Sequence, residues 1–201
     1  MRSCSKIVDG AESRRNGLNQ LIVRAHTGYA QTILTRKDLE RIYSGVFLEW
    51  CTTVEGTIEE LFFGLLTGRL SHSDQNTRSL VTIKSANVAR RAVSGGKPYV
   101  DWLPVDQTKE RAKAFLASGK PFDRITGFDK EALTQMHTIR NAIAHHSNHA
   151  NRRFLDTVVG RKAVPPAQRR PGGYLQGQHA TGQSRLDFHM AETLRVLRGL
   201  T

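Results

Sequence analysis

The sequence has few cysteines and few aromatic residues. Cys4 and Cys51 are its two cysteines among 201 residues, and aromatic residues make up 7%. Two cysteines form no disulfide scaffold, which excludes the small disulfide-rich secreted class. Hydrophobic residues make up 38% of the chain, enough to bury a core without a disulfide or a metal. We therefore expect one domain over residues 1–201 in a reducing cytoplasm.

Long apolar runs are also missing. The first residues, MRSCSKIVDGAESRRNG, lack the apolar stretch of a signal peptide. No window approaches the roughly eighteen apolar residues that a membrane-spanning helix needs. We therefore expect a soluble protein with no membrane partner, and a flexible N-terminus over residues 1–15.

Acidic residues are scarce relative to basic ones. Thirty Lys and Arg face eighteen Asp and Glu, which gives a net charge of +12. Such an excess favours a polyanionic partner, nucleic acid before anionic membrane, although solubility alone could explain it. The charge is uneven: residues 38–66 hold six acidic residues and one basic, whereas residues 140–170 hold seven basic and one acidic. This segregation indicates a charged face.

Helical periodicity dominates the chain. It predicts a first helix over 16–34, a long second helix capped by Thr35, a helix capped by Asp106, a helix from about Phe128 to Ser147, and a final amphipathic helix over 184–199. Residues 79–84 could form a short strand or lead into a helix over 85–93. Residues 160–183 hold five glycines and three prolines and predict a basic loop. The fold class is therefore an all-α bundle of four to five main helices.

The stretch HTIRNAIAHHSNHANRR, residues 137–153, concentrates polar and basic side chains. At about 100° per residue, Ala132, Met136, Ile139 and Ile143 form the core stripe, and a second, polar stripe holds Thr134, His137, Asn141, His145 and Asn148. Asn141 and His145 lie one turn apart, but Arg140 lies about 140° round the helix from His145. For both to meet over one phosphate, the arginine must wrap round, the helix must end near Ala144, or a second copy must contribute.

Three other interpretations compete with a functional one. The polar stripe could simply face solvent. His145 and His149 have the i, i+4 spacing of a zinc pair, but the sequence offers no obvious third ligand, so we expect no metal. Trp50 and Trp102 could stack on bases, although their apolar patterns favour core positions.

The six residues from Arg140 to His145, R-N-A-I-A-H, resemble the R-N-x-x-x-H signature of the HEPN superfamily. The surrounding pattern is similar too: a long helix with FLEWCTTVEGTIEELF precedes the motif, KPFDRITGF leads into it, and a helix with RRF follows. The arrangement is most similar to the RiboL-PSP-HEPN branch. Members are small α-helical proteins, often ribonucleases of toxin–antitoxin and antiviral defence systems.

The resemblance implies a homodimer in which facing motif helices build one composite site. It implies RNA cleavage without metal or other cofactor, with Arg140, Asn141 and His145 as catalytic residues. His146 and His137 are accessory candidates. Some members carry a tyrosine two places after the histidine, where a partner antitoxin transfers nucleotides. Ser147 stands at that position, so we do not expect that mode of inactivation.

The chemistry of RNA suits these residue types. RNA carries its own nucleophile, the 2′-hydroxyl, so an enzyme needs a proton acceptor, a proton donor and a cation. Histidine can exchange protons near neutral pH, and arginine matches phosphate oxygens. The expected products are a 2′,3′-cyclic phosphate and a 5′-hydroxyl. A basic run is expected to bind the RNA backbone: Arg152, Arg153, Arg161, Lys162, Arg169 and Arg170.

Two further functions stay open at this point. The chain could be a catalytically silent module that binds RNA or a protein such as an antitoxin or a defence-system partner. It could also be a helical interaction subunit whose dimer is its whole function.

Overall fold

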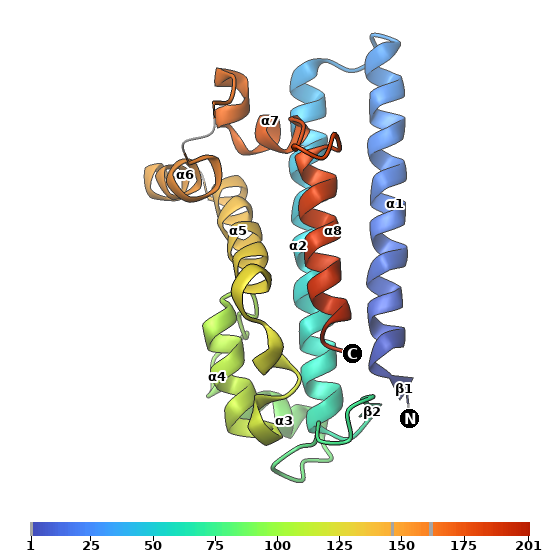
Figure 1. The fold of residues 1–201 in the computed structure, drawn as a ribbon, viewed down its shortest axis with the longest axis vertical. Helices are drawn as coiled ribbons and strands as arrows, with labels where there is room; N and C mark the ends of the chain where they lie inside the picture. The colour runs from blue at the N-terminus through green and yellow to red at the C-terminus, as the bar shows by residue number, and fades with distance from the viewer. Residues whose placement is uncertain (1, 146, 161–162) are drawn as a thin grey trace. The chain divides into compact units, whose positions relative to one another are not determined.

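The computed structural model describes residues 2–145, 147–160 and 163–201. Eight α-helices and one pair of two-residue strands occur in these ranges, so the all-α class is confirmed (Figure 1). The strands and α-helices are β1 Arg2–Ser3, α1 Cys4–Ala30, α2 Arg36–Leu66, β2 Leu70–Ser71, α3 Ala86–Ser94, α4 Val105–Phe115, α5 Gly127–Ala144, α6 Asn148–Phe154, α7 Pro171–Gln176 and α8 Arg185–Arg198. Short 3-10 or π-helical turns lie at Ala117–Gly119, Phe122–Arg124, Leu155–Val159 and Pro166–Arg169. Within the described ranges, no helix has the length and apolar character needed to cross a membrane.

The chain divides into two compact units. Unit 1 comprises Met1–Glu12, Thr53–Thr134 and Leu194–Thr201, and unit 2 comprises Ser13–Thr52 and Gln135–Thr193. Helices α1, α2, α5 and α8 each contribute residues to both units. The motif therefore belongs to unit 2, although α5 begins in unit 1.

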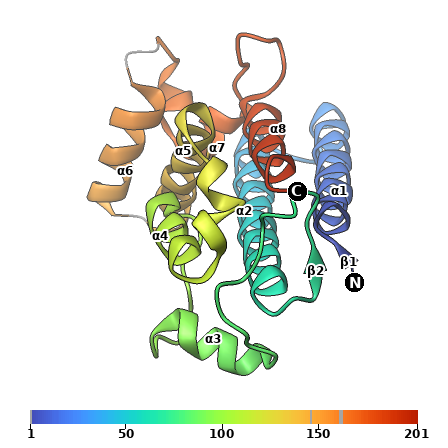
Figure 2. The same ribbon diagram turned by 60° about the horizontal axis from the view of Figure 1, so that its bottom comes forward.

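An aromatic cluster forms the core of unit 1. The Phe62 ring centroid lies 4.9 Å from that of Trp102 and 5.7 Å from that of Phe122. Trp102 is buried, and its Nε1 donates to Glu59 Oε2 at 3.1 Å. Helices α3 and α4 and the parallel β1–β2 pair belong to the same unit (Figure 2). Burial of this indole confirms a core position and leaves it no face on which a base could stack.

Helices α2 and α8 pack side by side in unit 2 (Figure 1). Trp50 is fully buried, and its Nε1 donates to Thr193 Oγ1 at 2.8 Å. The Phe47 and His189 rings pack edge to face at 6.2 Å. Trp50 is thus a second core tryptophan with its one donor satisfied, as expected of a buried indole.

The start of α2 and the buried face of α8 both confirm the sequence prediction. Thr35 N and Oγ1 both donate to Asp38 Oδ2, and Asp38 N donates back to Thr35 Oγ1 at 3.3 Å. This reciprocal cap begins α2, and the hydrogen bonds from Thr35 lower the pKa of Asp38. Helix α8 buries the predicted apolar positions, which are Leu186, Met190, Leu194 and Leu197.

The N-terminal residues differ from the expectation of a flexible segment. Helix α1 begins at Cys4, twelve residues before the predicted start, and ends at Ala30. Cys4, Ile7, Val8 and Ala11 are buried. Their i, i+3, i+4, i+7 spacing gives this short stretch one apolar face, and burial of that face extends the helix. Residues 79–84 lead into helix α3, the second of the two predicted alternatives, and Ser85 caps that helix.

The segment 160–183 is also more ordered than the predicted basic loop. Its described part contains the turn Pro166–Arg169 and helix α7, with Gly172, Gly173, Tyr174 and Leu175 buried. A Cβ atom on Gly172 would lie 2.5 Å from the backbone oxygen of Glu40. Glycine therefore lets α7 lie against α2 at a distance that any side chain would prevent.

Candidate functional site

Helix α5 presents a buried face and a partly exposed polar face in unit 2. Met136 and Ile139 are fully buried, and Ala142 is nearly so, whereas His137, Arg140 and Asn141 are half-buried. The core stripe was predicted correctly at its centre. Ile143 is half-buried because it borders a groove instead of the core.

The helix ends at Ala144, three residues earlier than predicted. His145 N donates to Asn141 O at 2.9 Å and closes the last turn. Ser147 then caps α6, its hydroxyl accepting from Ala150 N at 3.2 Å. A serine that caps the next helix stops the previous one before it. Of the three geometries considered for joining Arg140 and His145, the early helix end is present.

A row of hydrogen bonds links three motif side chains on α5. Arg140 Nη1 donates to Asn141 Oδ1 at 3.0 Å, and Asn141 Nδ2 donates to His137 Nε2 at 3.0 Å. Because arginine can only donate, the amide oxygen must face Arg140 and the amide nitrogen must face His137. His137 Nε2 is therefore an acceptor in this arrangement.

From the sequence, Asn141 could orient His145, one turn toward the C-terminus, or donate to a phosphate. In the structure its amide nitrogen donates to His137, one turn toward the N-terminus. The His145 backbone still bonds to Asn141 O, but the side-chain oxygen and nitrogen of Asn141 are engaged by Arg140 and His137. His137 was an accessory candidate in the sequence and joins Arg140 and Asn141 in the structure.

His145 lies apart from that row. It is exposed, and its ring makes no hydrogen bond within the described part of the chain. It borders a groove that neither Arg140 nor Asn141 lines. A single chain thus brings Arg140, Asn141 and His137 together and leaves His145 separate, while His146 lies outside the described residues.

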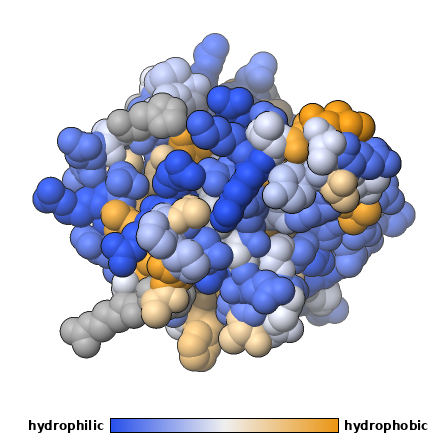
Figure 3. All heavy atoms as spheres, turned by 90° about the horizontal axis from the view of Figure 1, so that it is seen from above, coloured by the Kyte–Doolittle hydropathy of each residue, from blue (hydrophilic) through white to orange (hydrophobic). Residues whose placement is uncertain are grey.

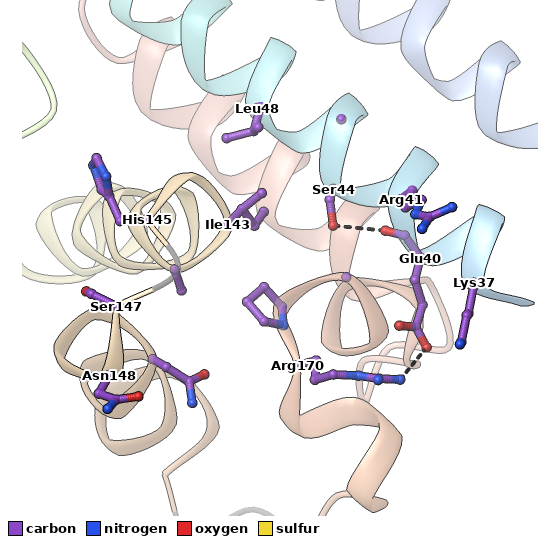
Figure 4. A pocket seen from close by; sticks show the side chains of 15 residues that line it. Lys37, Glu40, Arg41, Ser44, Leu48, Ile143, His145, Ser147, Asn148 and Arg170 are labelled. Carbon is purple, nitrogen blue, oxygen red and sulfur yellow. Dashed lines mark hydrogen bonds and ion pairs between the residues drawn. The ribbon is translucent and has the colours of Figure 1, made fainter.

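The groove beside His145, which we call the His145 groove, has a volume of about 740 Å³. Figure 4 shows α2 on one side and the end of α5 with the start of α6 on the other. Its lining residues on α2 are Lys37, Glu40, Arg41, Ser44, Gly45 and Leu48; those on the opposite side are Ala142, Ile143, His145, Ser147, Asn148 and Asn151; and Arg170, Pro171 and Gly172 complete it. In Figure 4 the His145 ring is directed away from Arg170 and Glu40.

The charges of the groove are only partly compensated. Arg170 Nη2 pairs with Glu40 Oε1 at 3.1 Å, and Arg41 Nη1 approaches Asp38 Oδ1 at 3.5 Å (Figure 4 shows the first pair). Lys37 is exposed and has no ion-pair or hydrogen-bond partner among the described residues. Lys37 is therefore the cation of this groove that is available to an external anion.

The structure describes four of the six residues of the predicted basic run. Arg152, Arg153 and Arg169 are exposed and make no ion pair within the described ranges. Arg170 is the pair of Glu40, and Arg161 and Lys162 lie outside the described residues. Hydrophilic residues cover most of the face seen in Figure 3, with small apolar patches between them.

The sequence reasoning missed the α2 side of the groove. Lys37, Arg41, Ser44 and Leu48 recur at three- to four-residue spacing and therefore share one stripe of α2. Ser44 and Gly45 are small residues within a strongly apolar helix, and small side chains leave room beside it. A basic stripe beside small residues could have predicted this wall of the groove. It was missed because residues 38–66 as a whole are acidic.

Comparisons add no further identification. Among the described residues, no group of three or more His, Cys, Asp or Glu side chains could hold a metal ion. Searches against protein-family models, curated proteins and solved structures found no match.

Proposed function

We propose that this chain is a metal-independent endoribonuclease whose reaction uses Arg140, Asn141 and His145. The observation that carries the proposal is the row from Arg140 through Asn141 to His137, which orients a guanidinium on the partly exposed face of α5. An oriented guanidinium on a polar helix face suits a phosphate better than it suits a core. The net charge of +12 adds general attraction for RNA.

The chemistry needs a proton acceptor, a proton donor and a cation. His145 takes the proton of the 2′-hydroxyl, whose oxygen attacks the adjacent phosphorus, and the leaving 5′-oxygen takes a proton from the protonated His145 or from water. Arg140 stabilises the negative charge that builds on the phosphorane oxygens. The bond to the 5′-oxygen breaks, which leaves a 2′,3′-cyclic phosphate and a free 5′-hydroxyl. His137 is a positioning residue, because it acts on Arg140 through Asn141.

Two copies of the chain would supply what one copy lacks. Within one chain, Arg140 is bonded to Asn141 and His145 borders a different surface. A homodimer that pairs two α5 helices about a two-fold axis would place one copy's His145 near its partner's Arg140. The proposed setting is cytoplasmic, with RNA as substrate and an antitoxin or defence-system protein as regulator, in line with the HEPN resemblance.

A catalytically silent RNA-binding module is the second candidate. The exposed Arg152 and Arg153 and the unpaired Lys37 favour it, since they would bind phosphates with or without chemistry. It differs from the first candidate in giving salt-dependent binding but no product.

Cleavage of single-stranded RNA in EDTA tests the proposal. His145→Ala should lower the cleavage rate by about 10²–10⁴-fold, the usual contribution of a general acid or base. His149→Ala is the matched control, because His149 is also exposed and lies four residues away on α6. Equal activity of His145→Ala and wild type would contradict the proposal, and binding without any product in the wild type would favour the silent module.

A further inference from the structure

We infer that the His145 groove binds a single-stranded segment of RNA, with a phosphate on Lys37 and base edges on Asn148 and Asn151. The identity of the polymer rests on the proposed function, whereas the position of the site rests on the groove itself. This assigns a substrate-binding surface to residues of α2 and α6 that lie outside the R-N-x-x-x-H motif.

The first argument is the free charge. In the groove, Glu40 is neutralised by Arg170, and Lys37 has no carboxylate partner in the described part of the chain. Arg152 lies four residues after Asn148 and therefore continues the face of α6 that lines the groove. A strand that follows this face meets Lys37 in the groove and Arg152 beyond it, and both can contact phosphates.

The second argument is the pair of amides. Asn148 and Asn151 lie three residues apart on α6 and both border the groove. Each side chain offers two donors and one acceptor oxygen, which match the edges of bases. Neither makes a side-chain hydrogen bond to another described residue, so both are available to a ligand.

The third argument is the lining between these polar groups. Leu48, Ile143 and Pro171 supply apolar contacts, and no Phe, Tyr or Trp is among the described lining residues. A base would therefore rest against aliphatic side chains and be held by its edge, instead of stacking between aromatic rings as in many single-strand binders.

The fourth argument is size and strandedness. A volume of about 740 Å³ lies in the range of sites that hold one small ligand, so it fits a short stretch of nucleotides. A double helix keeps its base edges in deep or shallow grooves of A-form geometry, where short asparagine side chains on this wall would not meet them. The site therefore favours unpaired RNA.

Fluorescence anisotropy of the full chain with a labelled ten-nucleotide 2′-O-methyl RNA tests the inference. This single strand lacks the free 2′-hydroxyl and stays uncleaved during the measurement. Lys37→Glu should raise the Kd about tenfold, the equivalent of one lost charge-assisted phosphate contact. The slope of log K against log salt should fall by about 0.7 to 1.

Lys6→Glu is the matched control, because Lys6 is an exposed lysine in the first turn of α1 as Lys37 is in the first turn of α2. The Kd of Lys6→Glu should change less than that of Lys37→Glu, although both carry the same change in net charge. A second variant, Asn148→Ala with Asn151→Ala, leaves the charge unchanged and should also weaken binding. Circular dichroism verifies that each variant is folded.

The outcomes separate this inference from the proposed function. Any one of three results would overturn the inference. These are equal Kd values for Lys37→Glu and Lys6→Glu, unchanged binding by the double asparagine variant, and tighter binding of the corresponding duplex. Cleavage of RNA without dependence on Lys37 would retain the nuclease and reject the groove. Binding that depends on Lys37 without any cleavage would retain the groove and reject the nuclease.

Discussion

Two grooves run beside α2, one in each unit, and both are lined by basic side chains. The second, which we call the Arg90 groove, has a volume of about 540 Å³ in unit 1 and is lined in part by Arg2, Arg69 and Arg90. Two of these three arginines have carboxylate partners: Arg2 pairs with Glu60 at 3.0 Å, and Arg90 pairs with Glu59, whereas Arg69 Nε donates to the hydroxyl of Thr67. The His145 groove contains Lys37, which has no such partner among the described residues.

The difference shows that the number of cations does not decide whether a groove can take an anion. In the Arg90 groove, Glu59 and Glu60 face the same space as the arginines and would repel a phosphate. Arg90 also stacks on the Phe63 ring at 4.9 Å, so its guanidinium already serves packing. In the His145 groove, the one lining carboxylate is held by Arg170, and a cation and two amides remain.

The largest expected effect on stability comes from adding a side chain at Gly172, where α7 lies against α2. Gly172→Ala places a methyl group 2.5 Å from Glu40 O and 2.7 Å from Ser44 Oγ, so the backbone must shift. We expect a loss of about 1–3 kcal/mol in the free energy of unfolding, as is typical of overpacking. Denaturant unfolding followed by circular dichroism measures it.

Gly45→Ala is the matched control in the same groove. A Cβ at Gly45 meets nothing within 4 Å, and Gly45 lies inside α2. Alanine there should leave stability unchanged or raise it by roughly 0.5–1 kcal/mol, because alanine is the better helix former. Equal unfolding free energies for the two variants would show that α7 does not pack on α2 as described.

A smaller effect should follow from releasing the arginines of the Arg90 groove. Glu59→Gln with Glu60→Gln keeps an acceptor for Trp102 and removes the two carboxylates. We expect a new anion site, with RNA affinity up to about tenfold higher and a salt slope steeper by roughly 0.7 for each phosphate contacted. Anisotropy with the same 2′-O-methyl strand measures both.

The control for that change is Asp106→Asn with Glu110→Gln. These residues pair with Lys130 and Lys113, line neither groove, and give the same change in net charge. A gain of RNA affinity as large as that of the Glu59/Glu60 variant would mean that net charge alone controls binding. It would contradict the claim that the carboxylates of the Arg90 groove keep RNA out of that groove.

The sequence was sufficient for the helices whose own residues determine them. The cap of Thr35 and Asp38 and the apolar stripe of α8 are local patterns, and both are present in the structure. The flexible N-terminus and the loop at 160–183 were wrong in their described parts for different reasons. The stripe at Cys4, Ile7 and Val8 was overlooked, whereas the packing of Gly172 depends on α2, more than a hundred residues earlier in the chain.

The candidate site was predictable in part. The helical pattern placed Asn141 on the polar stripe and Arg140 about 140° round the helix from His145, and the structure joins Arg140 and Asn141 by a hydrogen bond. The hydrogen bond from Asn141 to His137 was not predicted, since His137 and His145 both lie four residues from Asn141 and the sequence does not decide between them. The groove could not be predicted, since it combines α2 with segments at 142–151 and 170–172 that only the fold brings together.

The most direct test of the central claim is the rate and product chemistry of RNA cleavage in EDTA by wild type, Arg140→Ala and Arg90→Ala. Arg140 is hydrogen-bonded to Asn141 on the partly exposed face of α5, whereas Arg90 is engaged by Glu59 and Phe63. We predict 2′,3′-cyclic phosphate ends, a rate about 10²–10³-fold lower in Arg140→Ala, and a rate close to wild type in Arg90→Ala. Undiminished cleavage by Arg140→Ala, or equal losses in both variants, would contradict the account.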